Sequence, residues 1–517
     1  MTSYSPTRVS RGSAGAVSVA VVAVVAVVAV VATPSGATGQ PAAVLRAPLA
    51  AAVQAGDRLQ VERLLSQAID VNAAEPDGTT ALHWAVQRDD APLTARLLEA
   101  GADVNAPNRY QVTPLSLAAL NGSVSMVDRL LEAGADPQQA ALDGETPLLT
   151  AARTGIPEVV ERLMTYGADP NAREGWRGQT ALMWAAAEGH PGVARLLVEH
   201  GADVRASTND GFTPLLFAAR RGDIETTRLL LDAGVPVTES APDGTSVLVL
   251  AILNAHYELA GLLLDAGADP NVADARGSAL HVLAWVRRPG TPSTTNVMPR
   301  VPTGTLDSLA LAERLLQAGA DPDARIAWEE PPFDKVSGRV RVPEDVSVAP
   351  TYLSWVGATP FFVAAKHADV PLMQLLVEHG ANAVLATPQN ITPLMAAAGL
   401  GYWLAESPGS EVEALAAVTL AVELGADVNA ATDFEAAPLG DLRWGGSTAL
   451  HGAVIRDAPS VVRYLVEQGA SLDMRNSQGW TPLDMTRGVF VANTQKTYDE
   501  VGRLLEALGA DASASGR

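Results

Sequence analysis

The sequence predicts an all-α solenoid of about twelve stacked helix–turn–helix repeats. The first observation is the motif Gly-Ala-Asp-Val-Asn at 101–105, which returns along almost the whole chain. Its period is 33 residues, with one step of 34, through the regular first half. Close copies begin at Gly134, Gly167, Gly201, Gly267, Gly319, Gly425 and Gly509. A period in this range is typical of architectures in which each unit buries its apolar face only against its neighbours.

A second motif keeps the same period and predicts the first helix of each unit. In Thr113-Pro-Leu-Ser-Leu-Ala the threonine can cap a helix, because its hydroxyl accepts a free backbone N–H of the first turn. The proline suits the first helical position, where a missing N–H costs nothing. Copies start at Thr80, Thr146, Thr180, Thr213, Thr359, Thr392, Thr448 and Thr481. The first helix is expected to end at a glycine such as Gly122, and a second helix follows until the next Gly-Ala-Asp.

The two motifs in register resemble the ankyrin repeat family, whose units begin with Thr-Pro-Leu-His-x-Ala and end in Gly-Ala-Asp-Val-Asn. The nearest matches to the first half are Thr80-Ala-Leu-His83 and Thr448-Ala-Leu-His451, and the resemblance covers roughly 45–514. It implies that protein partners bind on a concave side built from loop tips and first helices. Four units lack the helix-ending glycine that the family has, so strained or loosened helix ends are expected there: Asp89, Ala255, Ala368 and Asp457.

The first 37 residues predict an export signal. Arg8 and Arg11 precede an apolar run at 14–32, and small residues follow as far as Ala37. A cleaved signal peptide followed by a linker at 38–44 is the favoured interpretation. The alternative is an uncleaved anchor, because nineteen residues of this kind can span a bilayer. Both place the repeats outside the cytoplasm.

Composition narrows the compartment and the partners. The chain has no cysteine and a net charge of −22, and its Lys+Arg total of 36 is almost all arginine. The electrostatic field of such a negative chain repels nucleic acid and anionic lipid, so we expect neither as a partner. We expect membrane contact only through an uncleaved anchor. The arginine, alanine and valine bias suggests a bacterium, and hence a periplasmic or secreted protein. We expect a monomer.

The regular repeats at 45–285 give way to an interrupted unit at 286–358 and irregular repeats at 359–515. Long insertions are expected at about 288–305 and 326–357, with smaller ones near 401–410 and 434–446. Loops of this length tend to be functional or disordered. Their aromatic residues Trp328, Phe333, Trp355 and Trp444 either anchor a partner or fold back over their own repeats.

Two further groups are candidates for partner contact. Near the end of the first helices lie Arg88, Arg153, Arg220 and Arg221. They form either a basic track for acidic side chains or a set of cations stabilising helix C-termini. At the loop tips, Tyr110, Trp176 and Phe212 either touch a partner or pack on the next repeat. Trp84 and Trp184, within first helices, are expected to belong to the core or its wall.

The sequence gives no sign of catalysis. Its eight histidines are scattered and lack the spacing of a zinc site, and no Gly-rich phosphate loop is present. We therefore expect no catalytic residues, no cofactor and no metal. The predicted function is an exported, non-enzymatic scaffold that binds partner proteins on its concave face. Two alternatives stay open: a chaperone-like accessory protein for a periplasmic enzyme, and a cryptic hydrolase or binding pocket at 326–357.

Overall fold

The computed structural model describes residues 47–67, 69–288, 301–327, 355–401, 409–433, 445–487, 490–491, 494–495 and 497–511. Within these ranges the helices form twelve pairs, which confirms the predicted all-α solenoid and its number of repeats.

We call the first helix of each pair the inner helix and the second the outer helix. The inner helices are α2 (Pro48–Ala55), α4 (Ala81–Gln87), α6 (Pro114–Asn121), α8 (Pro147–Thr154), α10 (Ala181–Glu188), α12 (Pro214–Arg221), α14 (Val247–Leu253), α16 (Ala279–Arg287), α18 (Pro360–Lys366), α20 (Pro393–Ala398), α22 (Ala449–Arg456) and α24 (Pro482–Thr486). The outer helices are α3 (Arg58–Leu65), α5 (Ala91–Glu99), α7 (Val124–Glu132), α9 (Pro157–Thr165), α11 (Pro191–Glu199), α13 (Ile224–Asp232), α15 (Tyr257–Asp265), α17 (Ser308–Gln317), α19 (Val370–Glu378), α21 (Glu411–Glu423), α23 (Pro459–Glu467) and α25 (Asp499–Ala507).

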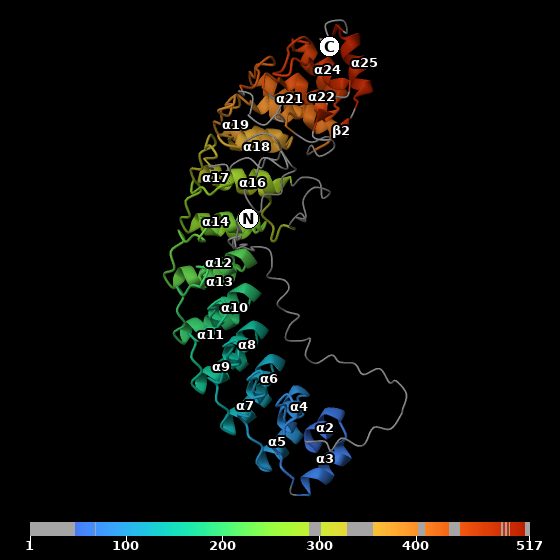
Figure 1. The fold of residues 1–517 in the computed structure, drawn as a ribbon. Helices are drawn as coiled ribbons and strands as arrows, with labels where there is room; N and C mark the ends of the chain where they lie inside the picture. Colours follow the sequence, from blue (N-terminus) through green and yellow to red (C-terminus); the bar gives the residue numbers. More distant parts are fainter. Residues whose placement is uncertain are drawn as a thin grey trace, which may run out of the picture.

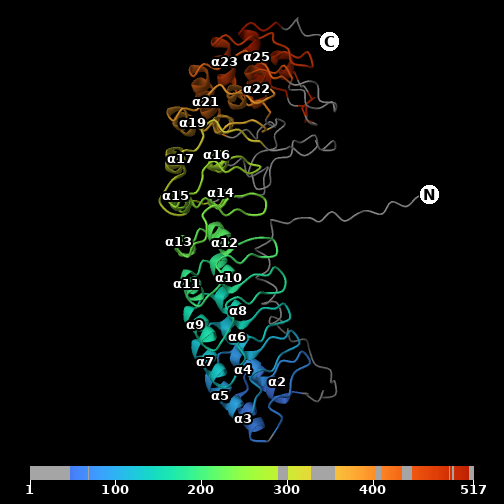
Figure 2. The same ribbon diagram turned by 90° about the vertical axis from the view of Figure 1, so that its left-hand side faces the viewer.

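The stack is a long crescent. Figure 1 shows the inner helices on its concave side and the outer helices on its convex side. Seen from the side, the loops that join successive repeats project away from the outer helices (Figure 2). We call each of these loops a finger. Near the C-terminus two short strands, β1 (Phe490–Val491) and β2 (Thr494–Gln495), pair antiparallel.

The predicted caps define the inner helices. In α6 the Ser116 backbone N–H donates to Thr113 Oγ1 at 3.2 Å, and Pro114 occupies the first turn. The helix ends at Gly122, whose φ of 68° is left-handed. A side chain there would also collide with Ile156 of the next repeat, at 2.1 Å from Cδ1. Glycine is therefore favoured at this position both by the turn and by the close approach of the neighbouring unit.

The asparagine of the repeat-end motif joins one repeat to the next. Asn105 Nδ2 donates to the Gly134 carbonyl at 3.0 Å, and Asn105 Oδ1 accepts from the Asp136 N–H at 2.8 Å. The same pair of bonds runs from Asn72, Asn171, Asn271 and Asn429 to the following unit. The side chain thus satisfies backbone groups that a helix end leaves without partners, and it fixes the spacing of the stack.

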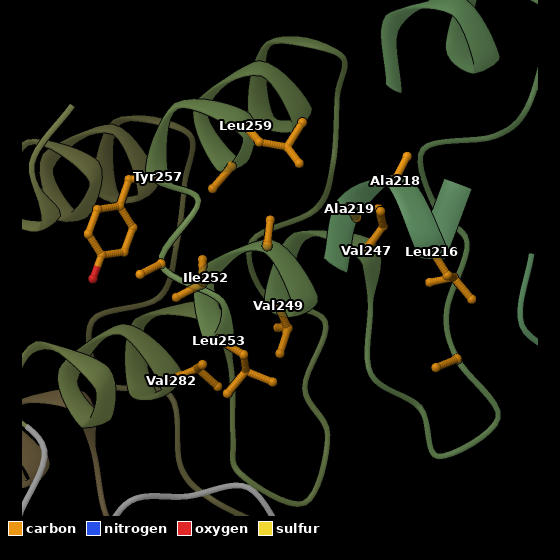
Figure 3. Close-up of a cluster of buried hydrophobic side chains, with 14 of the residues drawn as sticks. Leu216, Ala218, Ala219, Val247, Val249, Ile252, Leu253, Tyr257, Leu259 and Val282 are labelled. Carbon is orange, nitrogen blue, oxygen red and sulfur yellow. The ribbon is translucent and has the colours of Figure 1, made fainter. Parts of the chain in front are cut away.

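The core runs between neighbouring units and has no single centre. Figure 3 shows one section, where Leu216 of α12, Val249 and Ile252 of α14, Leu259 of α15 and Val282 of α16 contribute side chains to one buried layer. Because each unit shares its apolar face with the next, an isolated unit could not bury it.

The stack continues through the interrupted unit. Helix α16 packs on both α14 and α18, and α17 packs on both α15 and α19. The two ends of the insertion predicted at 326–357 are joined by backbone hydrogen bonds. There the Ile326 N–H donates to the Ala358 carbonyl at 3.0 Å, and the Gly357 N–H donates to the Ile326 carbonyl at 2.7 Å. A long insertion is tolerated because its two ends meet at the position of an ordinary finger.

The four units without a helix-ending glycine do have strained helix ends. Asp89, Ala255, Ala368 and Asp457 have φ values of 54°, 58°, 52° and 60°, in the left-handed region that glycine normally occupies. The prediction made from the missing glycines is therefore confirmed. The neighbouring stack holds these residues in a conformation that a Cβ disfavours.

We expect Asp89→Gly to raise the free energy of unfolding by about 0.5 kcal/mol. Removing the Cβ relieves strain of about 1–2 kcal/mol, and the greater freedom of glycine in the unfolded chain offsets about half of it. The side chain of Asp89 is exposed, so no packing is lost. Gly134→Ala is the matched control, because this glycine has a φ of 91° and open space around it. Chemical denaturation should show Gly134→Ala losing stability while Asp89→Gly gains it, and a loss in both would contradict the strain argument.

Candidate functional site

The concave face is open along the inner helices α4 to α14. In α4, α6, α10, α12 and α14 one residue near the middle of the helix is half-buried between fully buried neighbours. These residues are Trp84, Leu117, Trp184, Phe217 and Leu250. The residue three positions later lies on the same helix face, and it is exposed in α6, at Leu120 (38 %), and in α12, at Arg220. Together these positions form a mostly apolar floor on the concave side.

The second half differs. Every residue of α18 and α20 is buried, as are residues 279–285 of α16 and 449–455 of α22. The positions equivalent to the half-buried floor are occupied by Val282, Val363 and Ala396, none of which is exposed. Among the described residues, the accessible concave surface therefore lies in the regular first half of the stack.

The four candidate arginines lie along this open face, but they do not act alike. Arg88 donates from Nη2 to the Gln54 carbonyl at the end of α2, so it caps the helix of the preceding repeat. Arg153 pairs with Glu145 at 3.0 Å and lies over the Trp184 ring at 5.5 Å. Arg220 and Arg221 are exposed and form no ion pair with the residues that the structure describes. Arg88 therefore fits the interpretation that these arginines stabilise helix C-termini. The charges of Arg220 and Arg221 are available to pair with a partner.

The candidate loop-tip residues also divide into two kinds. Phe212 is half-buried and packs against Phe217, with ring centroids 6.0 Å apart, so it belongs to the floor. Tyr110 and Trp176 project from their fingers, at 39 % and 71 % exposed. Each has a neighbouring arginine over its ring, with Arg177 Cζ 4.8 Å from the Trp176 centroid.

The loop aromatics of the second half receive a correction. Trp355 is only 1 % exposed and lies in the core against Trp285, with centroids 4.3 Å apart, and against Phe362. The alternative, in which the loop covers its own repeat, therefore holds for Trp355, and the expectation that it meets a partner does not. Trp328, Phe333 and Trp444 lie outside the described residues.

The basic residues of α18 are also in the core. Lys366 is buried, and its ammonium lies 5.3 Å from the Trp355 ring centroid and donates to the Leu400 carbonyl at 3.4 Å. Burial, together with the nearby positive charge of Arg456, lowers the pKa of Lys366 to about 7. Lys366 thus adds no positive charge to the concave surface.

Sequence reasoning missed several residues of the open face. Leu142 is 70 % exposed at the tip of the finger between those of Tyr110 and Trp176, and its N–H donates to the Tyr110 carbonyl at 3.1 Å. Phe217 was not singled out, and Trp184 was assigned only to the core or its wall. Aligning the repeats would have found them, because Phe217 and Trp184 occupy equivalent positions, as do Leu142 and Trp176.

The open face presents apolar and positively charged side chains. Among the described residues, no three histidine or carboxylate side chains gather in a way that could hold a metal ion. In the same part of the chain, no helix combines the length and apolarity needed to cross a bilayer. An apolar floor bordered by arginines and exposed aromatic fingertips suits the binding of another macromolecule.

Comparison with known proteins agrees with this geometry. A family model described as ankyrin repeats (3 copies) matches residues 49–141, 137–208 and 204–274, and one described as ankyrin repeats (many copies) matches 420–485. The mouse (Mus musculus) ankyrin repeat and SOCS box protein 16 is 35% identical over 127 residues, which is 24% of each chain. The human (Homo sapiens) protein phosphatase 1 regulatory subunit 27 is 40% identical over 70 residues, 14% of this chain and 41% of that protein. The chain thus spans between a quarter and about two fifths of the length of these relatives.

Proposed function

Because the chain belongs to the ankyrin repeat family, we propose that it is an exported, non-enzymatic scaffold that holds protein partners on the open concave face of α4 to α14. Ankyrin repeats are protein-interaction modules, so protein binding is the general function. The single observation that carries the location is burial: the floor is accessible in the first half and closed from α16 onward.

The rigidity of the stack supports a scaffold. Its face is formed before a partner arrives, because the inner helices are fixed by caps and by bonds between repeats. Little ordering entropy then opposes binding. The related human protein is named as a regulatory subunit of a phosphatase, and a part that acts through another protein agrees with a non-enzymatic role. The apolar run at 14–32, preceded by two arginines, supports export.

A second function is favoured by one observation. Leu142 and Trp176, about 70 % exposed on successive fingers, could hold apolar segments of many clients for a short time. A chaperone-like accessory protein for a periplasmic enzyme would use such a surface. A scaffold would bind one dominant partner and a chaperone-like protein would bind many, so the number of partners distinguishes the two functions.

Photo-crosslinking in intact cells tests the proposal. A crosslinking amino acid at Leu120, on the concave face, should capture one dominant exported protein, whereas the same residue at Glu161 on outer helix α9 should not. Trp176→Ala should weaken that capture, and Tyr166→Ala, which removes an exposed aromatic at the end of α9, should leave it unchanged. Many partners captured weakly at Leu120 would favour the chaperone-like function. Equal capture from Leu120 and Glu161 would reject the concave site.

A further inference from the structure

Charge is distributed unevenly between the two sides of the open half. The inner helices α4 to α12, with their C-cap residues, carry four arginines (Arg88, Arg153, Arg220 and Arg221) and one acidic residue, Glu188. The five outer helices of the same repeats, α5 to α13, carry five arginines and eight acidic residues. In a chain with a net charge of −22, the inner helices of this half thus have a positive excess.

The available cations gather on two neighbouring repeats. Arg220 and Arg221 at the end of α12 are exposed, and Arg177 contacts the Trp176 ring. None of the three forms an ion pair within the part of the chain that the structure describes. The nearby carboxylate of Glu174 is already occupied, because it accepts the backbone N–H groups of Trp176, Arg177 and Gln179. Glu188 is the acidic residue of the inner helices α10 and α12, and Asp210 lies in the finger before α12, while further acidic residues of these repeats lie on the outer helices α11 and α13.

Apolar surface lies between these cations. Trp184 of α10 and Phe217 of α12 occupy equivalent positions of adjacent inner helices, and Phe212 extends the floor beside Phe217. The Trp176 ring projects from the finger before α10. Apolar and positive side chains thus lie along one path across two repeats, from the finger before α10, over the middle of α10 and α12, to the end of α12. Aromatic side chains and arginine are the residue types that most often dominate binding energy at interfaces.

We propose that this path, formed by Trp176, Arg177, Trp184, Phe217, Arg220 and Arg221, binds an acidic segment of a partner protein that has aromatic or aliphatic side chains between its carboxylates. The inference rests on the proposed function and adds the chemistry of the partner. Carboxylates of the segment pair with Arg177, Arg220 and Arg221, and its apolar side chains cover Trp184 and Phe217. Arginine suits this role because its planar guanidinium binds a carboxylate through two hydrogen bonds.

Nucleic acid is the competing occupant, since arginine and aromatic rings also bind single strands. The charge of the whole molecule favours the protein segment. A field of −22 repels a phosphate backbone, and long-range repulsion acts before the local arginines can make contact. A short acidic segment carries fewer charges and gains from the apolar floor.

Fluorescence anisotropy on the full chain tests the proposal with three labelled peptides of equal length. The first alternates glutamate with phenylalanine and leucine, the second replaces each glutamate with lysine, and the third replaces each apolar residue with alanine. We expect the first to bind, and to weaken as salt screens the charges, while the other two bind at least about tenfold more weakly. A labelled single-stranded oligothymidylate should not bind.

The matched variants separate a local effect from an effect of net charge. Arg220→Gln with Arg221→Gln should weaken binding of the acidic peptide about tenfold, mainly through slower association and a smaller salt dependence. Arg195→Gln with Arg228→Gln changes the net charge equally, on the outer helices α11 and α13, and should leave binding unchanged. All four side chains are exposed, so circular dichroism should show unchanged helicity.

The outcomes distinguish this inference from the proposed function. Equal binding of the lysine peptide, tight binding of the oligonucleotide, or equal loss in both double variants would overturn the acidic partner. If the dominant protein still crosslinks at Leu120 in those cases, the concave site stands without this chemistry. Absence of any crosslink at Leu120 would contradict both the proposed concave binding site and the acidic partner.

Discussion

Arg287→Met is expected to lower the local stability of the repeats around α16 and α19 by about 3–5 kcal/mol. Arg287 Nε and Nη2 donate to the two carboxylate oxygens of Asp369 at 2.7 and 3.1 Å. The Asp369 carboxylate has no exposure to solvent. Removing the arginine would leave the buried carboxylate with the Leu372 N–H and the more distant Arg288, 4.0 Å away, and losing the close partner of a buried charge costs far more than losing an exposed pair. The pair also joins two units across the interruption, since Arg287 ends α16 and Asp369 caps α19.

Hydrogen exchange resolved by peptide is the appropriate measurement, because a long repeat array need not unfold in one step. Arg162→Met is the matched control: its pair with Asp128, at 3.0 Å, joins two outer helices but is exposed, so less than about 1 kcal/mol is expected. Arg287→Met combined with Asp369→Ser should recover much of the loss, because serine keeps the helix cap and removes the charge. Similar losses in Arg287→Met and Arg162→Met would show that burial of this pair contributes little.

The periodic part of the molecule could be predicted because each repeat meets the same physical problem. Thr113 caps a helix, and Gly122 both turns the chain and clears Ile156, wherever the period places their equivalents. The absence of that glycine was itself informative, since Ala255 and Ala368 do have left-handed conformations. The stack dictates these features, so one sequence suffices to place them.

The non-periodic part could not be predicted in the same way. Trp355 was expected either in a partner interface or over its own repeat, and only the structure places it against Trp285, 70 positions earlier in the sequence. Arg287 and Asp369 are 82 residues apart, and no other repeat has an equivalent pair among the residues that the structure describes. Contacts across an insertion depend on where the chain re-enters the stack, and the repeat period carries no information about that.

The open concave face could be predicted from the sequence only in part. Its candidate arginines were found from the sequence, but Arg88 and Arg153 have partners within the stack, whereas Arg220 and Arg221 form no ion pair in the described ranges. The distinction depends on which neighbour each side chain reaches. Phe217 and Leu142 could have been found by aligning equivalent positions. The sequence does not show, however, that the concave face is accessible at these repeats and buried after α14.

Acid is expected to destabilise the second half of the stack before the first. His281 and His451 are buried, and burial lowers the pKa of each to about 4, despite a hydrogen bond to a carbonyl that favours the protonated form. In both residues Nδ1 accepts the N–H of the capping residue, Ser278 or Thr448, at 3.1 Å. Nε2 therefore carries the hydrogen and lies 3.1 and 3.2 Å from the carbonyls of Ala358 and Trp480. A proton added at Nδ1 would face another N–H.

The direction and the pH range follow from these pKa values. Above about pH 6.5 the histidines are neutral in both states, and the full stability is present. As pH falls further, the unfolded chain binds protons that the folded chain does not, so stability falls until about pH 4. Each histidine can contribute up to about 3 kcal/mol to this loss. His367, buried beside Lys366, has its pKa lowered in the same way.

Hydrogen exchange at pH 7 and pH 5, corrected for the intrinsic rate at each pH, should show the largest loss of protection in α16, α18 and α22. In the first half only His83 occupies the equivalent motif position, and Ser116, Leu149, Met183 and Leu216 replace it in the units that follow. His451→Leu imitates those units, so it should remove part of the acid sensitivity of α22 even though it gives up two hydrogen bonds at neutral pH. Equal loss of protection in α6 to α13 would contradict the assignment, because those helices contain no histidine at this position whose protonation could open them.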